Sequence, residues 1–440
     1  MTHSVNRFAW ATAFLATLIA PLLLATAAGH RGGLLLEISL VLGLVATSLF
    51  VCVIVMASRP RTLTATLGIE RISRVHRYLG ITLLTVVLAH TLAVVLAAPG
   101  NWALLDLAHA PPRARAATAG TIALILLTAL SLLRRRLRLS YRFWRVTHVL
   151  LAAGSFPAVA LHVVLLRHLV VDPAMRTCFG LLAAAVALML LNRWVLRPLG
   201  IGRRTFRVWD TWVEAGEVIT LVLAPAGTHR IRWRGPLRFS AWIRLRRWGV
   251  CTDHPFTIAS APRDDGVIEF TIRRVGDYTH SLARLRPGSQ VYLDGPHGSF
   301  TADRRPTAEG LVLIAGGVGI TPMVSMLRTL ADRGDPRRHT IFIGARTPDQ
   351  LLFTEELADL SRRLDLAVVT TVTRPDDDWG GHIGRIDADL LDRSLPEHDQ
   401  RQRVDYYVCG STQFVAGIQM SLHRLRIPLD RIHTEQFEMV

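Results

Sequence analysis

Six long apolar runs dominate the first half of the chain, and short polar stretches separate them. The runs cover residues 8–28, 34–57, 75–98, 117–133, 146–166 and 177–196. A helix needs about 18–20 apolar residues to cross a bilayer, and only the fourth run falls short of that length. The pattern therefore predicts an integral, multi-pass membrane domain of six helices over residues 1–200.

Beyond residue 200 the apolar runs become short. Alternating segments between 205 and 305, such as 218–223 and 267–272, are bounded by turn residues, which is typical of a small antiparallel barrel. From residue 310 predicted strands alternate with predicted helices, as in a doubly wound α/β domain. The strands are expected at 310–315, 339–344, 366–371 and 404–409, and the helices at 322–333, 353–363, 387–393 and 413–424.

These patterns predict a multi-domain protein. A six-helix transmembrane bundle is expected over 1–200, an antiparallel β-barrel domain over 201–306 and a doubly wound α/β domain over 307–440.

Charge is distributed unevenly between the two halves. The chain has no lysine, and its 51 arginines against 34 acidic residues give a net charge of +17. Residues 1–200 hold 19 arginines and only four acidic residues, whereas the rest of the chain holds 32 and 30. Because the excess arginines lie between apolar runs, they indicate a positive-inside membrane topology rather than a nucleic-acid-binding surface.

The arginines also predict an orientation. They gather between the second and third runs, between the fourth and fifth, and after the sixth. We therefore expect a plasma-membrane protein with both termini and the whole second half on the cytoplasmic side. The first run ends in Ala25-Thr26-Ala27, which resembles the cleavage site of a secretory signal peptide, so its removal stays open.

Four histidines form two matched pairs within the apolar runs. His76 and His90 lie in the third run and His148 and His162 in the fifth, and both pairs are 14 residues apart. Fourteen residues turn a helix by about 1400°, close to four full turns, and rise about 21 Å. Each pair therefore shares one helix face, with one member near each membrane boundary.

The third and fifth spans run in the same direction, so His76 is expected to face His148 and His90 to face His162. Haem iron takes an axial ligand on each side, and neutral imidazole is a common one. The spacing thus predicts two stacked haem b groups with these histidines as metal ligands. The alternative is that the histidines only form hydrogen bonds between helices.

The four cysteines, Cys52, Cys178, Cys251 and Cys409, form no C-x-x-C pair. They therefore give no support to an iron–sulfur or zinc–thiolate site, or to a disulfide framework.

A glycine-rich turn follows the first predicted strand of the α/β domain. Residues 311–315 read as a buried strand, residues 316–319 contain three glycines, and Pro322 lies in the first turn of the next helix. Glycines let the backbone approach a phosphate, and a helix N-terminus offers free N–H groups. The strict G-x-G-x-x-G order is absent, and a tight turn without a ligand is the alternative.

Several segments, in order along the chain, resemble the ferredoxin–NADP reductase superfamily in the form found in NADPH oxidases and ferric reductases. The likeness, together with the paired histidines, covers roughly residues 70–440. The segments are His254-Pro255-Phe256-Thr257-Ile258-Ala259-Ser260, Gly276 to Leu282, Gly295 to Phe300, Gly316 to Pro322, Cys409-Gly410 and Glu435-Gln436-Phe437.

The resemblance implies an FAD-binding barrel and a nucleotide-binding α/β domain. The flavin ring would be held by His254, Pro255, Phe256 and Thr257, and the FAD pyrophosphate would lie near Arg273, Thr279 and Ser281. Guanidinium and hydroxyl groups at a turn suit phosphate oxygens.

The same resemblance places NADPH or NADH along Gly316, Gly317, Gly319 and Thr321, with Phe437 stacked near the flavin and Cys409 near the site of hydride transfer. Without the resemblance, Phe437 is a core side chain and Cys409 a small buried hydrophobe. Arg346 and Arg374 are candidates for a 2′-phosphate, and the choice between NADH and NADPH stays open.

Together these features predict an oxidoreductase that passes electrons from cytosolic NAD(P)H through FAD and two haems to an external small-molecule acceptor, a ferric chelate or molecular oxygen. The alternative is a membrane-tethered flavoprotein without haem that feeds a separate redox partner. A third possibility, a haem-binding membrane protein without enzymatic activity, conflicts with the flavin motifs.

Overall fold

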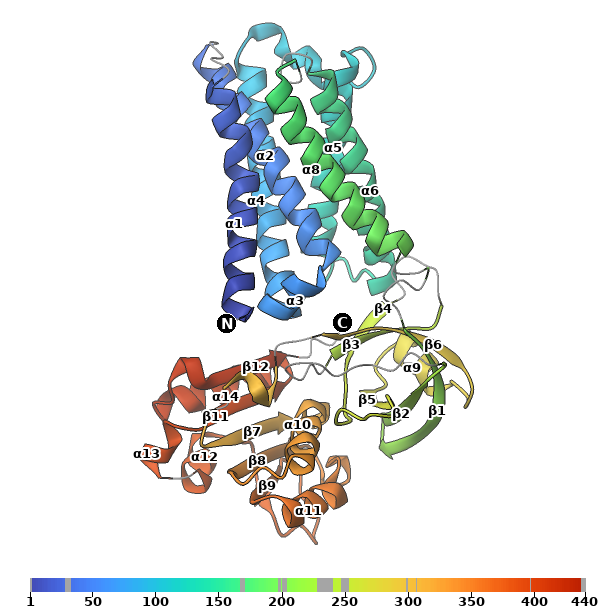
Figure 1. Ribbon diagram of the computed structural model, residues 1–440, viewed down its shortest axis with the longest axis vertical. Coiled ribbons are helices and arrows are strands. Elements are labelled where there is room, and N and C mark those ends of the chain that lie inside the picture. The colour runs from blue at the N-terminus through green and yellow to red at the C-terminus, as the bar shows by residue number, and fades with distance from the viewer. Residues whose placement is uncertain are drawn as a thin grey trace. The chain divides into compact units, whose positions relative to one another are not determined.

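The computed structural model describes residues 2–27, 33–166, 171–196, 199, 204–227, 240–246, 253–297, 300–305, 307–395 and 397–436. The chain divides into two compact units, with the division between Ile201 and Gly202. The first unit contains the long helices, and the second contains both β-sheets (Figure 1).

Six helices in the described part of the chain are long and apolar enough to cross a membrane. Each predicted run falls on one of them, which confirms the six-span prediction. They are α1 (Thr2–Ala27), α2 (Leu34–Ser58), α4 (Ile69–Leu96), α5 (Pro112–Leu133), α6 (Tyr141–Leu165) and α8 (Pro173–Leu191).

The long helices pack with α2 along α4 and α5 along α6. A Cβ added at Gly120 of α5 would lie 3.4 Å from the Cβ of Ala158 on α6, so small residues let these two backbones approach. The ends of the helices carry local caps: Ser140 accepts from the Phe143 N–H at the start of α6, and Asp172 accepts from the Met175 N–H at the start of α8.

Short elements complete the helical unit. They are the helix α3 (Arg61–Leu67), the 3₁₀ turn η1 (Pro99–Leu105) and the π-turn η2 (Asn192–Leu196). Large apolar side chains such as Leu23, Leu150 and Leu181 remain more than 60% exposed on the bundle, as expected for a surface that faces lipid.

The first sheet of the second unit is antiparallel, in the order β4-β3-β6-β1-β2-β5. A bridge between Ile258, just after β4, and Phe270 of β5 joins its two edges. Its elements are β1 (Arg204–Ala215), β2 (Val218–Pro225), β3 (Ser240–Arg244), β4 (Asp253–Thr257), β5 (Ile268–Arg273), α9 (Asp277–Ala283) and β6 (Gln290–His297). The predicted barrel is therefore confirmed.

The second sheet is parallel, in the order β10-β9-β8-β7-β11-β12. Its strands are β7 (Gly310–Gly316), β8 (Arg338–Ala345), β9 (Leu366–Val372), β10 (His382–Ile383), β11 (Asp405–Gly410) and β12 (Ile432–Gln436). The chain leaves β7 toward β8 and returns to β11 on its other side, so the order reverses between β7 and β11. Ligands of such sheets bind at this point, beyond the carboxyl ends of the strands.

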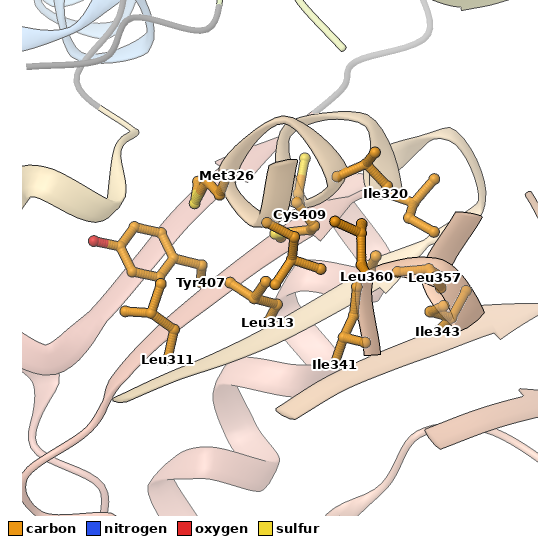
Figure 2. Close-up of a cluster of buried hydrophobic side chains, with 14 of the residues drawn as sticks. Leu311, Leu313, Ile320, Met326, Ile341, Ile343, Leu357, Leu360, Tyr407 and Cys409 are labelled. Carbon is orange, nitrogen blue, oxygen red and sulfur yellow. The ribbon is translucent and has the colours of Figure 1, made fainter. Parts of the chain in front are cut away.

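Helices cover both faces of the parallel sheet. They are α10 (Thr321–Asp332), α11 (Thr354–Arg363), α12 (Ala388–Ser394), α13 (His398–Arg401) and α14 (Thr412–Arg424). On one face Leu313 and Ile341 pack with Met326 of α10 and Leu360 of α11 (Figure 2). On the other face Phe342 packs with residues of α12 and α14. The doubly wound α/β prediction is thus confirmed.

An arginine joins the two sheets of the second unit. Arg328 of α10 donates through Nη1 to the Ala259 carbonyl at 3.0 Å and to Glu269 of β5 at 2.6 Å. Its Nη2 donates to Glu356 of α11 at 2.8 Å. Burial by itself would lower the pKa of Arg328, but the bonds and charges of Glu356 and Glu269 raise it overall. The Ser325 hydroxyl adds a bond to the Ser260 carbonyl at 2.7 Å.

We predict that Arg328→Leu lowers the free energy of unfolding of the second unit by about 2 kcal/mol. This value lies between the effects of exposed and fully buried ion pairs, because the Arg328 side chain is 20% exposed and leaves two acidic partners behind. Arg362→Leu is the matched control, since its pair with Asp359 is largely exposed. Thermal unfolding measures both, and equal effects of the two substitutions would contradict the prediction.

Candidate functional sites

The four predicted histidines meet as two pairs within the helical unit. The ring centroids of His76 on α4 and His148 on α6 lie 6.3 Å apart, and those of His90 and His162 lie 6.5 Å apart. The first histidine of α4 faces the first of α6, so these two helices run in the same direction, as the sequence predicted.

Three of these rings are held by backbone carbonyls. The Nδ1 of His76 lies 3.2 Å from the Val53 oxygen, that of His90 2.7 Å from the Ser39 oxygen, and that of His162 2.9 Å from the Arg113 oxygen. A carbonyl oxygen can only accept, so Nδ1 carries the proton in each ring and Nε2 keeps its lone pair. Metal-binding histidines are oriented in this way by their outer partners.

The fourth ring, His148, is held by a side chain. Its Nδ1 lies 3.1 Å from the hydroxyl oxygen of Ser131 on α5. The indole Nε1 of Trp144 also donates to this oxygen, at 3.2 Å. All four histidines therefore use Nδ1 in a hydrogen bond.

The distance between the rings of each pair suits a shared metal. An ion bound to one nitrogen of each ring by bonds of about 2 Å would hold the ring centres about 6 Å apart, since a ring centre lies about 1 Å beyond its nitrogen. The observed 6.3 and 6.5 Å agree with this separation. A haem iron, which takes one imidazole on each side of its plane, fits both pairs.

Gly43 of α2 leaves the space that the His90 ring occupies. A Cβ at this position would lie 3.1 Å from Cε1 and 3.2 Å from Nδ1 of His90, closer than ordinary van der Waals contact. Glycine here lets the ring lie against α2, where it reaches the Ser39 carbonyl.

The segment predicted to hold the flavin ring forms β4. His254 and Phe256 stack on the same partner, Tyr278 of α9, at centroid distances of 3.9 and 6.2 Å. The Tyr278 hydroxyl donates to the Ile243 carbonyl at 2.7 Å, which ties α9 to β3. The sequence prediction did not include Tyr278, although it lies within the segment from Gly276 to Leu282 that supported the resemblance. Pro255 also lies on β4, and Thr257 is buried at its end.

Thr279 and Ser281 lie in α9, and their hydroxyls have local partners. Thr279 Oγ1 donates to the Gly276 carbonyl at 2.8 Å and accepts from the N–H groups of Val275 and Gly276. Ser281 Oγ donates to the Asp277 carbonyl at 2.7 Å. The Thr279 bonds close the turn between β5 and α9, and the Ser281 bond lies within α9.

Arg273 ends β5 and extends toward the glycine turn of the α/β domain. A Cβ built on Gly317 would lie 3.0 Å from the Arg273 Nη2. The structure therefore brings the arginine predicted for the FAD pyrophosphate next to the loop predicted for the nicotinamide nucleotide.

The glycine turn itself follows β7. Gly317 has φ +54°, a conformation that favours glycine. A Cβ on Gly319 would lie 2.3 Å from the carbonyl oxygen of Cys409, so only glycine fits between this turn and the end of β11. Thr321, buried at the start of α10, donates to the Val318 carbonyl at 2.7 Å.

The neighbouring residues complete this edge of the sheet. Cys409 is fully buried and pairs in register with Ala315 of β7. The Phe414 ring lies against Gly316 and Gly410, where added Cβ atoms would come within 3.0 and 2.6 Å of it. Sequence reasoning missed Phe414, since only the fold brings it to these glycines. Phe437 lies outside the described residues.

Arg346 and Arg374 lie beyond the carboxyl ends of β8 and β9. The Arg374 N–H donates to the Arg346 carbonyl at 2.8 Å, and both residues are exposed. The two candidate partners of a 2′-phosphate are thus adjacent at the edge of the sheet where nucleotides bind.

Comparison with known proteins agrees with both parts of this description. The family described as "Ferric reductase like transmembrane component" matches residues 42–159, and "Oxidoreductase NAD-binding domain" matches residues 313–420. The chain is 30% identical to ferredoxin–NADP reductase B of Sorangium cellulosum over 189 residues, which are 42% of this chain and 77% of that protein. The chain belongs to the ferredoxin–NADP reductase family. Its reductase module is fused to a ferric reductase-like transmembrane domain.

A second relative matches about half of this chain and only part of its own length. A flavohemoprotein of Deinococcus radiodurans is 27% identical over 249 residues, which are 53% of this chain. The chain spans only 59% of that protein's own length.

Among solved structures, a flavohemoglobin from Malassezia yamatoensis has a TM-score of 0.50 at 19% identity, and covers 82% of this chain and 98% of its own. This likeness concerns the fold alone. The ferric reductase-like domain and the reductase module together support a transmembrane oxidoreductase that uses NAD(P)H and FAD.

Proposed function

We propose that this ferric reductase-like protein passes electrons from NAD(P)H, through FAD and two b-type haems, to an acceptor on the far side of the membrane. The observation that carries the proposal is the geometry of the four histidines. Each pair has the separation that a shared metal requires, and the Nδ1 hydrogen bonds leave Nε2 available. His76 and His148 would hold the inner haem, and His90 and His162 the outer one.

The chain's own residues hold and separate the redox groups. In this proposal the flavin ring is held by four residues of β4, which are His254, Pro255, Phe256 and Thr257. The FAD pyrophosphate lies near Arg273, Thr279 and Ser281. Gly316, Gly317, Gly319 and Thr321 receive the nicotinamide nucleotide, and Cys409 borders the place of hydride transfer. When bound, FAD would supply two-electron chemistry toward NAD(P)H and one-electron chemistry toward the haems.

The proposed domains are a transmembrane bis-haem domain (1–200), an FAD-binding barrel (201–306) and an NAD(P)-binding domain (307–440). The uneven distribution of arginine supports a plasma-membrane location with the reductase module in the cytoplasm. The acceptor in this proposal is a ferric chelate or molecular oxygen.

The first test is an anaerobic absorbance spectrum of the purified protein with added FAD, recorded before and after NADPH and, separately, NADH. We expect oxidised haem bands that move to their reduced positions, and the faster nucleotide identifies the donor. A protein that binds FAD but shows no haem bands would support the tethered flavoprotein instead.

We predict that Gly43→Val displaces the His90 ring and lowers the haem content from two groups per chain toward one. The added side chain would meet ring atoms that already lie 3.1 Å from the position of a Cβ, and overpacking of this kind is relieved by moving side chains. Gly180→Val on α8 is the matched control, because a Cβ there has nothing within 4 Å and α8 carries none of the four histidines. A pyridine haemochrome assay measures both variants, and equal haem contents would count against the prediction.

A further inference from the structure

The four histidines form their Nδ1 hydrogen bonds with two kinds of acceptor. His76, His90 and His162 donate to backbone carbonyls, which every residue type supplies. His148 donates to the Ser131 hydroxyl instead. Of the four histidines, only His148 has a side chain as its main hydrogen-bond acceptor. That acceptor also bonds to a second donor, Trp144.

The proton on the Ser131 hydroxyl can be located from its neighbours. Ser131 Oγ lies 2.7 Å from the Leu127 carbonyl, which can only accept, so the hydroxyl proton points there. Trp144 Nε1–H is a donor only and lies 3.2 Å from the same oxygen. The oxygen therefore accepts from both Trp144 and His148, so His148 carries its proton on Nδ1 and keeps the Nε2 lone pair.

This sharing weakens the bond to His148. One hydroxyl oxygen that accepts two hydrogen bonds has less electron density for each than one that accepts a single bond. The Trp144 indole is also close to the ligand, with its ring centroid 5.4 Å from that of His148. The Arg134 guanidinium lies 5.1 Å from the Trp144 ring, and a cation over an indole makes its N–H a better donor.

We propose that Ser131 and Trp144 are positioning residues that set the electron donation of His148, and thereby the reduction potential of the inner haem separately from the outer one. The proposal rests on the proposed bis-haem function. A stronger hydrogen bond at Nδ1 makes Nε2 a better electron donor, which favours ferric iron and lowers the potential. A weaker bond raises it.

Two substitutions then have opposite effects. Ser131→Ala removes the acceptor of the His148 bond, so the potential of one haem shifts to a more positive value. Trp144→Phe keeps an aromatic ring but removes the competing donor, so Ser131 accepts from His148 alone and the potential of the same haem shifts to a more negative value. Ser131→Thr keeps a hydroxyl and retains the wild-type potential. A role limited to packing does not predict shifts of opposite sign.

The measurement is a spectroelectrochemical titration of the full-length protein loaded with both haems. We expect two components, of which one moves in each variant, in opposite directions, while the other stays constant. Thr177→Ala is the matched control, because this hydroxyl of α8 donates within its own helix, to the Pro173 carbonyl, and α8 carries none of the four histidines. Shifts of the same sign, no shift, or equal movement of both components would overturn the proposal.

The failure of the bis-haem function is distinguishable from the failure of this inference, since wild-type protein without two haem components contradicts the former. If Ser131→Ala loses one of the two haems, the haem assay records a loss that itself supports positioning of His148, provided that Ser131→Thr retains both. Trp144→Phe then decides the sign of the effect.

Discussion

Replacing His76 with alanine is expected to lower the haem content from two groups per chain to one and to abolish electron transfer to an external acceptor. His76 faces His148 at 6.3 Å between ring centroids, so the substitution removes one of the two proposed ligands of the inner haem. Loss of outer-shell partners already costs about 10- to 100-fold in metal affinity or activity, so we expect loss of a direct ligand to lower acceptor reduction by more than about 100-fold.

The same variant should still reduce its flavin. The reductase module is built from β4, β5 and the turn after β7, none of which contains His76. Bleaching of the flavin absorbance by NAD(P)H under anaerobic conditions measures this step separately from reduction of the external acceptor. Intact flavin reduction together with lost acceptor reduction would place the block after the flavin.

His109→Ala is the matched control for this experiment. Its side chain is 86% exposed and pairs with Asp106, and it belongs to neither histidine pair. We expect two haems per chain and wild-type acceptor reduction. If His76→Ala behaves like His109→Ala, the haem-free flavoprotein becomes the better account of the protein.

Gly319→Ala is expected to have the second large effect, on the reductase module. The added Cβ would lie 2.3 Å from the Cys409 carbonyl oxygen and 2.7 Å from its carbon. Both are backbone atoms of a central strand, so the turn after β7 must move away from β11. Overpacking of this kind costs about 1–3 kcal/mol, and we expect a loss of about 2 kcal/mol in the free energy of unfolding.

The displaced turn also carries Gly316, Gly317 and Thr321, so we expect the KM for NAD(P)H to rise by about 10-fold, the equivalent of about 1.4 kcal/mol. Thermal unfolding and steady-state kinetics measure the two effects. Gly417→Ala is the matched control, because a Cβ at this position in α14 has nothing within 4 Å and alanine favours a helix interior. A Gly319→Ala protein with the stability and KM of this control would refute the close approach to Cys409.

The architecture of this protein could be predicted from its sequence to a large extent. A helix must be long and apolar to cross a bilayer, so the hydropathy of residues 1–200 predicts the six spans. The change from alternating short segments to strand–helix alternation predicted the antiparallel and parallel sheets. Strands β3 and β4 of the barrel were not among the segments predicted. In the parallel sheet β10 and β12 were missed, since β10 has only two residues, both exposed, and β12 pairs along a single edge.

The sequence also determined which histidines share a helix face, because helical geometry turns a spacing of 14 residues into one stripe. The sequence could not determine which group accepts the hydrogen bond from each imidazole ring. The Val53, Ser39 and Arg113 carbonyls orient three of the histidines, and no residue pattern marks a backbone carbonyl, because every residue carries one.

Contacts between distant segments were decided by the tertiary structure alone. These contacts join elements that are far apart in the chain: Tyr278 stacks on His254, Phe414 packs against Gly316, and Gly319 lies close to Cys409. Their positions depend on strand order and on how closely two backbones pack. Hydropathy and motifs report which residues prefer lipid, core or turn, whereas the packing of the folded chain selects the partner that each residue meets.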